Sequence, residues 1–134
     1  DTVAFNGNLL LNVGPKGDGT IPESQKQRLL DIGRWLGIYG NAIYNTTPYS
    51  KQKEELSTGE FVYYTQNTSS VFLIIDAPKP GDSELRIPAL PCKIDSMKNP
   101  GNIIAGFTEK ANHWLISLHQ IPEDSTPIVF SFSK

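Results

Sequence analysis

The pattern of hydrophobic positions changes near residue 45. Residues 8–13, NLLLNV, are almost continuously apolar, which is typical of a strand buried on both faces of a parallel sheet. After a loop rich in glycine and proline, apolar side chains recur at spacings of three and four, at Leu29, Ile32, Leu36 and Tyr39. This spacing predicts a helix over residues 21–39 with one apolar face, widened by Leu30 and Trp35. The start of the chain therefore reads as one βα unit.

The ends and the interior of this helix carry further signals. Thr20 and Glu23 have the spacing of a capping box, in which each side chain hydrogen-bonds the backbone of the other residue. Pro22 falls in the first turn, where its missing N–H costs nothing. Gly33, inside the helix, predicts the close approach of another backbone, and Gly40 is the candidate residue just past the end of the helix.

Beyond residue 45 the pattern becomes that of short strands. Apolar and polar residues alternate with period two, most clearly where Trp114, Ile116 and Leu118 are expected to face the core. Turn residues separate the candidate strands, which cover 60–65, 70–76, 84–88, 92–96, 103–108, 113–119 and 128–133. Strands at this spacing predict an antiparallel β-sandwich of about seven or eight strands.

The chain is therefore expected to be mainly β, with a sandwich preceded by a single βα unit. We expect residues 1–40 to be the last strand and helix of a (β/α)8 barrel, 41–49 a linker, and 50–134 the sandwich. One βα unit cannot close a barrel, which takes about 250 residues. Since the chain starts at Asp1 rather than Met, we expect a removed leader or a longer protein.

Composition narrows the classes of function. The formal net charge is −2 without a run of like charges, which argues against nucleic acid or an anionic membrane as a partner. No stretch approaches the about 20 apolar residues of a membrane span. The loop GPKGDGTIP lacks the Lys-Ser/Thr that ends a phosphate-binding P-loop. Because Cys92 is the single cysteine and both histidines lie far from it, we expect neither a metal site nor a cofactor.

The first third of the chain carries a family resemblance. The sequence NGNLLLNVGPKGDGTIP over residues 6–22, followed by Trp35-Leu36, Gly40 and Ala42-Ile43-Tyr44, resembles the end of the catalytic domain of the glycoside hydrolase family 29 α-L-fucosidases. The likeness is specific over residues 1–49. Beyond them it is architectural, since the family carries a β-sandwich after its barrel. The chain departs from the family's usual residues at two places. Ala4-Phe5 stands where the family usually has a Ser-Lys-like pair, and Tyr49 stands where the family often has Trp.

The resemblance implies a function for the whole enzyme rather than for this segment. Family members are retaining exo-glycosidases that release terminal α-L-fucose, chemistry that needs a carboxylate nucleophile and an acid about 5–5.5 Å apart. In the family both groups lie on earlier barrel strands, so we expect no catalytic residue here and an inactive isolated chain. The implied partners are the rest of the barrel and, through the whole enzyme, fucosylated glycans. The implied location is extracellular, lysosomal or periplasmic.

Several residues are candidates for supporting roles. Asn12, Gly14 and Pro15 stand where the last strand would meet the barrel mouth, so they are expected to shape the substrate pocket. In the alternative, Asn12 only satisfies neighbouring backbone and Gly14-Pro15 only turns the chain. The acidic candidates, including the pair Glu54-Glu55, are interpreted as solvated surface charge.

A second hypothesis makes the sandwich a non-catalytic carbohydrate-binding or adaptor module. Tyr63 and Tyr64 are the candidates for stacking on a sugar, and alternation predicts that one points inward and one outward. Asn45 and Asn67 begin N-glycosylation sequons in turn regions. The strand at 8–13, without its neighbours, is expected to be disordered, paired with the sandwich or exchanged between copies, giving self-association.

Overall fold

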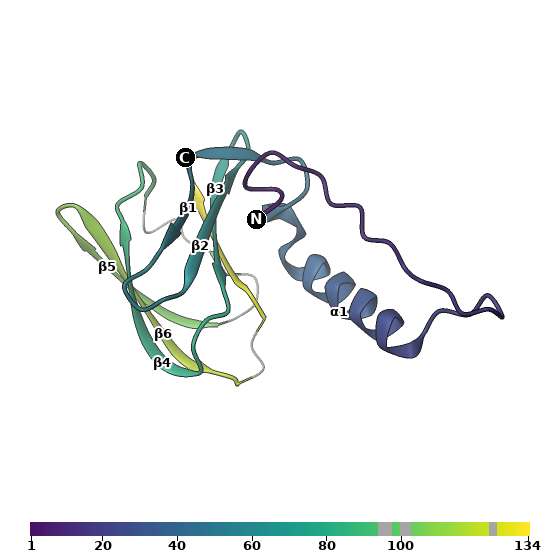
Figure 1. The fold of residues 1–134 in the computed structure, drawn as a ribbon. Helices are drawn as coiled ribbons and strands as arrows, with labels where there is room; N and C mark the ends of the chain where they lie inside the picture. The colour runs from purple at the N-terminus through teal and green to yellow at the C-terminus, as the bar shows by residue number, and fades with distance from the viewer. Residues whose placement is uncertain (94–97, 100–102, 124–125) are drawn as a thin grey trace.

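In the part of the chain that the structure describes, seven strands form two antiparallel sheets, preceded by one α-helix (Figure 1). The computed structural model describes residues 1–93, 98–99, 103–123 and 126–134. Helix α1 spans Glu23–Tyr39, and a 3₁₀ turn, η1, follows at Gly40–Ala42. The strands are β1 (Thr47–Glu55), β2 (Phe61–Gln66), β3 (Ser70–Asp76), β4 (Gly81–Pro88), β5 (Ile104–Lys110), β6 (His113–Ile121) and β7 (Ile128–Ser133). The strand orders are β1-β2-β3-β7 and β4-β6-β5, so the predicted mainly-β fold is confirmed.

The core lies between the two sheets. Its largest fully buried side chains include Trp114, Phe130 and Phe132, and the rings of Trp114 and Phe132 lie 5.1 Å apart between centroids. The alternation in β6 places Trp114, Ile116 and Leu118 on this inner face, and each is 1% exposed or less. The prediction that Trp114 belongs to the core is therefore confirmed.

The outer face of the four-stranded sheet is also apolar and covered. In β2 and β3 almost every residue is buried, because these central strands are packed on both faces. The outer cluster consists of Tyr63, Phe72, Ile74 and Val129 from the sheet with Ala4, Tyr39 and Ala42 above them. Residues 1–7 and the end of α1 thus form a second layer on this sheet.

Two side-chain hydrogen bonds fasten this second layer. The indole Nε1 of Trp35 on α1 donates to the carbonyl of Pro127, 2.8 Å away and directly before β7. The hydroxyl of Thr65 on β2 donates to the carbonyl of Ala42 in η1 at 2.7 Å, and this pair is buried. The chain therefore passes from helix to sheet through anchored contacts.

Thr65→Val is expected to lower the free energy of unfolding by about 1–3 kcal/mol, because the near-isosteric valine leaves the buried carbonyl of Ala42 without a donor. Urea denaturation followed by circular dichroism measures this loss. Thr68→Val, at an exposed position in the β2–β3 turn, is the control. Equal stabilities of the two variants would contradict a role for this hydrogen bond.

The end of the helix differs in detail from the sequence prediction. Gly40 has φ −56°, so it continues the right-handed path into η1 instead of ending the helix in a left-handed conformation. A Cβ at Gly40 would lie 3.0 Å from the ring of Tyr44, so a larger residue at this position would require the ring to shift. At Gly33 a Cβ would meet no atom within 4 Å. The predicted close approach at Gly33 is therefore absent among the residues that the structure describes.

Other elements in the structure differ from the predicted ones in their bounds or in whether they form. The helix begins at Glu23 with Pro22 as its N-cap and no side-chain cap, so the capping box predicted from Thr20 and Glu23 was wrong. Strand β1 begins at Thr47, within the segment predicted as a linker, and has no counterpart among the predicted strands. Of the strand predicted over 92–96, Cys92 and Lys93 are not in a strand, and residues 94–96 lie outside the described residues.

Candidate functional site

The most unusual surface belongs to the N-terminal arm, residues 1–22, together with α1. The arm runs outward from the sheet alongside the helix and returns through a loop (Figure 1). Leu9, Leu10 and Leu11 in this arm are 71%, 93% and 50% exposed. Leucines at such exposure in a row are uncommon on a free protein surface, because apolar area in water is unfavourable.

The predicted strand over residues 8–13 does not form. No backbone–backbone hydrogen bond to these residues occurs within the parts of the chain that the structure describes. The segment is flanked by a turn, in which Gly7 N donates to Thr2 O at 2.7 Å, and by a bond to the helix, in which Gly14 N donates to Gln25 Oε1 at 2.9 Å. A strand needs a neighbour for its backbone groups, and the described part of this chain supplies none. The expected re-pairing with the sandwich does not occur either, so the segment stands exposed.

An apolar groove separates the arm from the helix and the sheet. Its volume is about 810 Å³. Leu9 and Leu11 line one wall, Leu29 and Ile32 another, and Tyr63 and Ile74 are among the residues of its floor. The arm and the helix therefore do not pack directly on one another as a strand and helix of one βα unit would.

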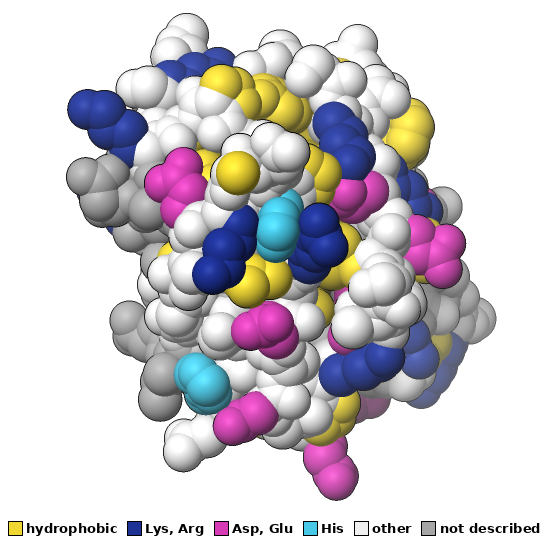
Figure 2. Space-filling model, turned by 90° about the vertical axis from the view of Figure 1, so that its left-hand side faces the viewer, with side chains coloured by type: hydrophobic (Ala, Val, Ile, Leu, Met, Phe, Trp, Pro, Cys, Tyr) yellow, Lys and Arg dark blue, Asp and Glu magenta, His cyan; other side chains and the backbone are white. Residues whose placement is uncertain are grey.

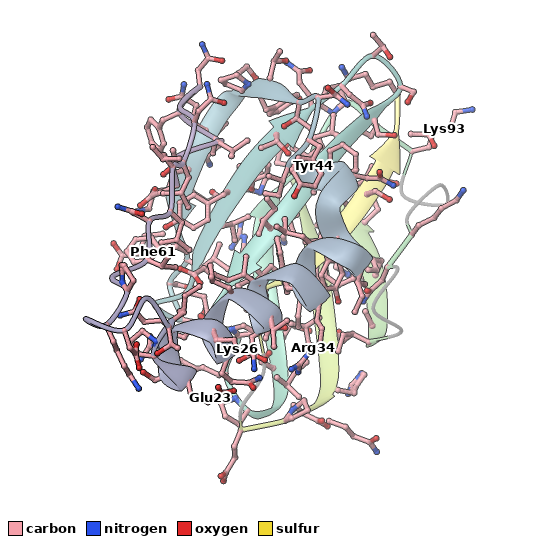
Figure 3. The ribbon with its side chains drawn as sticks, turned by 90° about the vertical axis from the view of Figure 1, so that its right-hand side faces the viewer. Glu23, Lys26, Arg34, Tyr44, Phe61 and Lys93 are labelled. Atoms are coloured by element: carbon pink, nitrogen blue, oxygen red, sulfur yellow. The ribbon has the colours of Figure 1, made fainter. Side chains whose placement is uncertain are left out.

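The helix shares this incomplete burial. Figure 3 looks onto α1, which crosses in front of the four-stranded sheet with Glu23 and Lys26 near its first turn. Leu30, Ile32 and Ile38 are 43–50% exposed, and only Tyr39 of the helix is fully buried. In the described part of the chain, every exposed large hydrophobic side chain lies between residues 5 and 44, at Phe5, Leu9, Leu10, Leu11, Ile21, Leu30, Ile32, Ile38 and Tyr44.

The residues predicted at a barrel mouth lie at the tip of the arm. Asn12, Gly14 and Pro15 are exposed, and the side-chain Oδ1 of Asn12 accepts from Val13 N at 2.8 Å. The Gly14 N–H is bound by Gln25 of α1, which fixes the turn to the helix. The structure thus brings these three residues together on one loop, with Asn12 bonded to its neighbouring backbone.

The loop between the arm and α1 is organised by Asp18. Its Oδ1 accepts from Thr20 N at 2.9 Å and from the Thr20 hydroxyl at 2.7 Å. These bonds hold the pKa of Asp18 below its ordinary value, the hydroxyl being the larger cause. They also explain the missing capping box, because the Thr20 side chain is turned toward Asp18 and away from the helix.

Thr20→Val is expected to raise the pKa of Asp18 toward its ordinary value without restoring it fully, because the Thr20 N–H still donates to the carboxylate. A carbon-detected NMR titration of the Asp18 carboxyl measures the change. Thr20→Ser, which keeps the hydroxyl, is the matched control and should titrate like the unmodified chain. If valine and serine gave the same midpoint, the hydroxyl would have no effect on this carboxylate.

Neither tyrosine proposed for sugar stacking presents an open ring. Tyr64 is 0% exposed in the inner core, while Tyr63 is 7% exposed on the outer face. The Nζ of Lys53 lies 4.1 Å from the ring centroid of Phe61 and 5.0 Å from that of Tyr63. The two side chains do point to opposite faces, as alternation predicts, but both faces are covered.

Glu54, interpreted as solvated surface charge, is instead largely buried. Its side chain is 13% exposed and accepts hydrogen bonds from the Tyr64 hydroxyl and from Lys51 Nζ. Burial, together with the bond to Glu54, raises the pKa of Tyr64. The prediction was wrong because the sequence KQKEE in β1 shows no alternation that would mark Glu54 as inward-facing.

The two sequon asparagines differ in their surroundings. Asn45 is exposed with φ 57°, two residues before β1. Asn67 is half-buried in the β2–β3 turn, where its Oδ1 accepts from Ser69 N at 3.0 Å and Ser70 N at 2.8 Å. The Oδ1 of Asn67 is thus engaged in holding the turn.

The described residues contain neither a metal-binding group of side chains nor a helix that could span a membrane. No three side chains among His, Cys, Asp and Glu gather into a group that could hold a metal ion. In the same part of the chain, no helix combines the length and the apolar character that crossing a membrane requires.

Known proteins resemble this chain, including the part that carries the exposed surface. The family model described as α-L-fucosidase matches residues 1–41, the region with nearly all of the large hydrophobic side chains that are exposed in the described structure. The tissue α-L-fucosidases of Macaca fascicularis and Homo sapiens are each 36% identical to this chain over 98% of its length. The chain spans only 28% of the length of these two relatives.

Solved structures agree over the whole chain. The α-fucosidase of Thermotoga maritima, crystallised with a mechanism-based inhibitor, is 31% identical with a TM-score of 0.76, and the match covers 99% of this chain and 32% of that one. The sandwich, the helix and the arm together therefore have a counterpart in one larger protein. Over nearly its whole length, this chain is similar to the C-terminal part of the α-L-fucosidases of glycoside hydrolase family 29.

Proposed function

We propose that this chain is the C-terminal portion of a retaining exo-α-L-fucosidase. In this proposal residues 1–40 complete the catalytic (β/α)8 barrel, 41–49 connect the two parts, and 50–134 form a sandwich that supports the barrel. The substrate is a glycan with terminal α-L-fucose. The nucleophile and the acid belong to the preceding barrel strands, and this chain supplies structural support.

Among the described residues, the confinement of the exposed large hydrophobic side chains to residues 5–44 carries this proposal. A nearly continuous apolar strand is stable between parallel neighbours, where both of its faces and both of its edges are covered. The preceding strands of a barrel would supply these neighbours for residues 8–13. They would also fill the groove of about 810 Å³ and cover Leu30 and Ile32 on α1.

The barrel-mouth role of Asn12, Gly14 and Pro15 belongs to the same proposal. These residues follow the apolar segment at its carboxyl end, and active sites of such barrels lie at the carboxyl ends of the strands. Gln25 holds the Gly14 N–H and so fixes the loop. In the whole enzyme this loop forms part of the wall of the fucose pocket.

An activity assay tests the proposal. The 134-residue chain should release no nitrophenol from 4-nitrophenyl α-L-fucoside, whereas the longer protein that contains it should release nitrophenol and yield fucose of retained configuration. Release by the short chain at a rate comparable to that of the longer protein would overturn the proposal. So would a longer protein that is folded and inactive on α-L-fucosides but active on another glycoside.

A further inference from the structure

A second hollow, unrelated to the arm, opens between the edges of the two sheets. It lies between the end of β1 and the end of β4, beside the turn from β5 to β6, and has a volume of about 390 Å³. Leu56 and Ile87, both buried, contribute to its lining. The volume is within the range of small-molecule sites, about 300–1,000 Å³.

The wall on the β1 side carries a carboxylate that is fixed in place. The Tyr64 hydroxyl, anchored in the core, binds Oε1 of Glu54, and Lys51 Nζ binds Oε2. Each carboxylate oxygen has two lone pairs, so each keeps accepting capacity after these bonds. Glu54 therefore offers a preorganised acceptor to the hollow, and Tyr64 acts as its positioning residue.

The opposite wall carries three polar side chains that can donate hydrogen bonds. Arg86 at the end of β4, Asn112 in the turn and His113 at the start of β6 line the hollow. Among the described residues, none of these three side chains has a hydrogen bond or an ion pair. Figure 2 looks onto the side of the molecule with β4, β5 and β6 and shows basic and acidic side chains interspersed on this face.

The charges around the hollow cancel. Glu54 and Glu55 contribute two negative charges, while Lys51 and Arg86 contribute two positive ones. An anionic ligand would face the carboxylates and a cationic ligand would face Arg86. A neutral ligand rich in hydroxyl groups matches this surface, since each hydroxyl both donates to a carboxylate and accepts from a guanidinium or an amide.

We propose that this hollow binds a neutral pyranose, as a carbohydrate site outside the catalytic barrel. Glu54 accepts from one or two ring hydroxyls, while Arg86 and Asn112 donate to others. Pro88, exposed at the rim, supplies apolar contact for the C–H face of the ring. The site uses neither Tyr63 nor Tyr64 for stacking, and it does not depend on the proposed fucosidase activity.

The test is an NMR titration of the 134-residue chain, which lacks the barrel and therefore any competing fucose pocket. The probes are methyl β-D-galactopyranoside and methyl α-L-fucopyranoside, and methyl β-D-galactopyranosiduronate is the anionic comparator. At least one neutral probe should cause saturable shifts of the backbone amides of Glu55, Ser57 and Asn112, with a Kd on the order of 1 mM. The uronate should bind more weakly than the galactoside.

Substitutions in the hollow then test whether its residues bind the sugar. Arg86→Ala and Asn112→Ala change exposed side chains and should keep the fold while weakening binding about tenfold. Glu54→Gln should weaken binding as well, and Glu84→Gln, an exposed carboxylate of β4 outside the hollow, should leave it unchanged. The proposal is overturned if no neutral probe gives saturable shifts, if the uronate binds more tightly, or if Arg86→Ala and Asn112→Ala bind like the unmodified chain.

Discussion

Leu10→Asp is expected to act very differently in two contexts. In the 134-residue chain the side chain is 93% exposed, so the substitution should change the free energy of unfolding by no more than about 0.5 kcal/mol. In the longer enzyme that we propose, the same position lies in a strand buried between parallel neighbours. An unpaired carboxylate there should cost about 3–5 kcal/mol, the scale of a buried charge without a partner.

Urea denaturation of both proteins, with and without the substitution, measures the contrast. Lys16→Asp introduces the same side chain into the exposed loop beyond the strand and should be tolerated in both contexts. A small and equal effect of Leu10→Asp in the two proteins would show that the arm stays exposed in the longer enzyme. The barrel part of the proposal would then fail, whereas the sugar hollow would be unaffected.

Trp114→Ala is expected to remove a large part of the stability of the sandwich. Trp114 is 1% exposed and packs against Phe132 between the sheets, so truncation should cost about 3–5 kcal/mol. Domains of this size have a total stability of about 5–15 kcal/mol. We therefore expect a partly unfolded chain at 37 °C, detectable as a lower midpoint in thermal denaturation by circular dichroism.

Trp114→Phe provides an informative comparison. The indole Nε1 of Trp114 is buried, with no hydrogen-bond partner in the described structure. Phenylalanine removes this unsatisfied donor while keeping most of the apolar ring, so its cost should be clearly smaller than that of alanine. His119→Ala, on the exposed face of β6, serves as the control for both. A loss from Trp114→Ala no larger than that from His119→Ala would contradict the central place of this ring in the core.

The elements that the sequence predicts correctly are those whose burial is decided within this chain. Strands β3 and β7 keep their predicted bounds, because their apolar patterns face surfaces that this chain provides. Helix α1 keeps its predicted end at Tyr39, the residue by which it packs onto the sheet, although much of its apolar face is exposed. Strand β1 is not predicted from the sequence, because an edge strand pairs on one side only and tolerates a polar sequence such as KQKEE. The burial of the Glu54 side chain is not predicted for the same reason.

The failures at the start of the chain have a different origin. The apolar run at 8–13 is typical of a buried strand, as in the barrel that we propose, but the described part of this chain provides no sheet neighbour for it. The predicted capping box does not form, because the hydroxyl of Thr20 bonds to the carboxylate of Asp18 instead of to the backbone of the helix. Periodicity indicates which side chains would be buried, whereas the partner that buries them lies elsewhere in sequence.

The contact of Trp35 with Pro127 has a practical consequence. Trp35 and Trp114 are the only two tryptophans of the chain, and Trp35 is half-buried where α1 meets the start of β7. In the Trp114→Phe variant, the tryptophan fluorescence would come from this junction alone. A red shift of the emission below the main denaturation midpoint would then report the helix lifting from the sheet while the sandwich stays folded. The protein thus contains an optical probe of the boundary between its two parts.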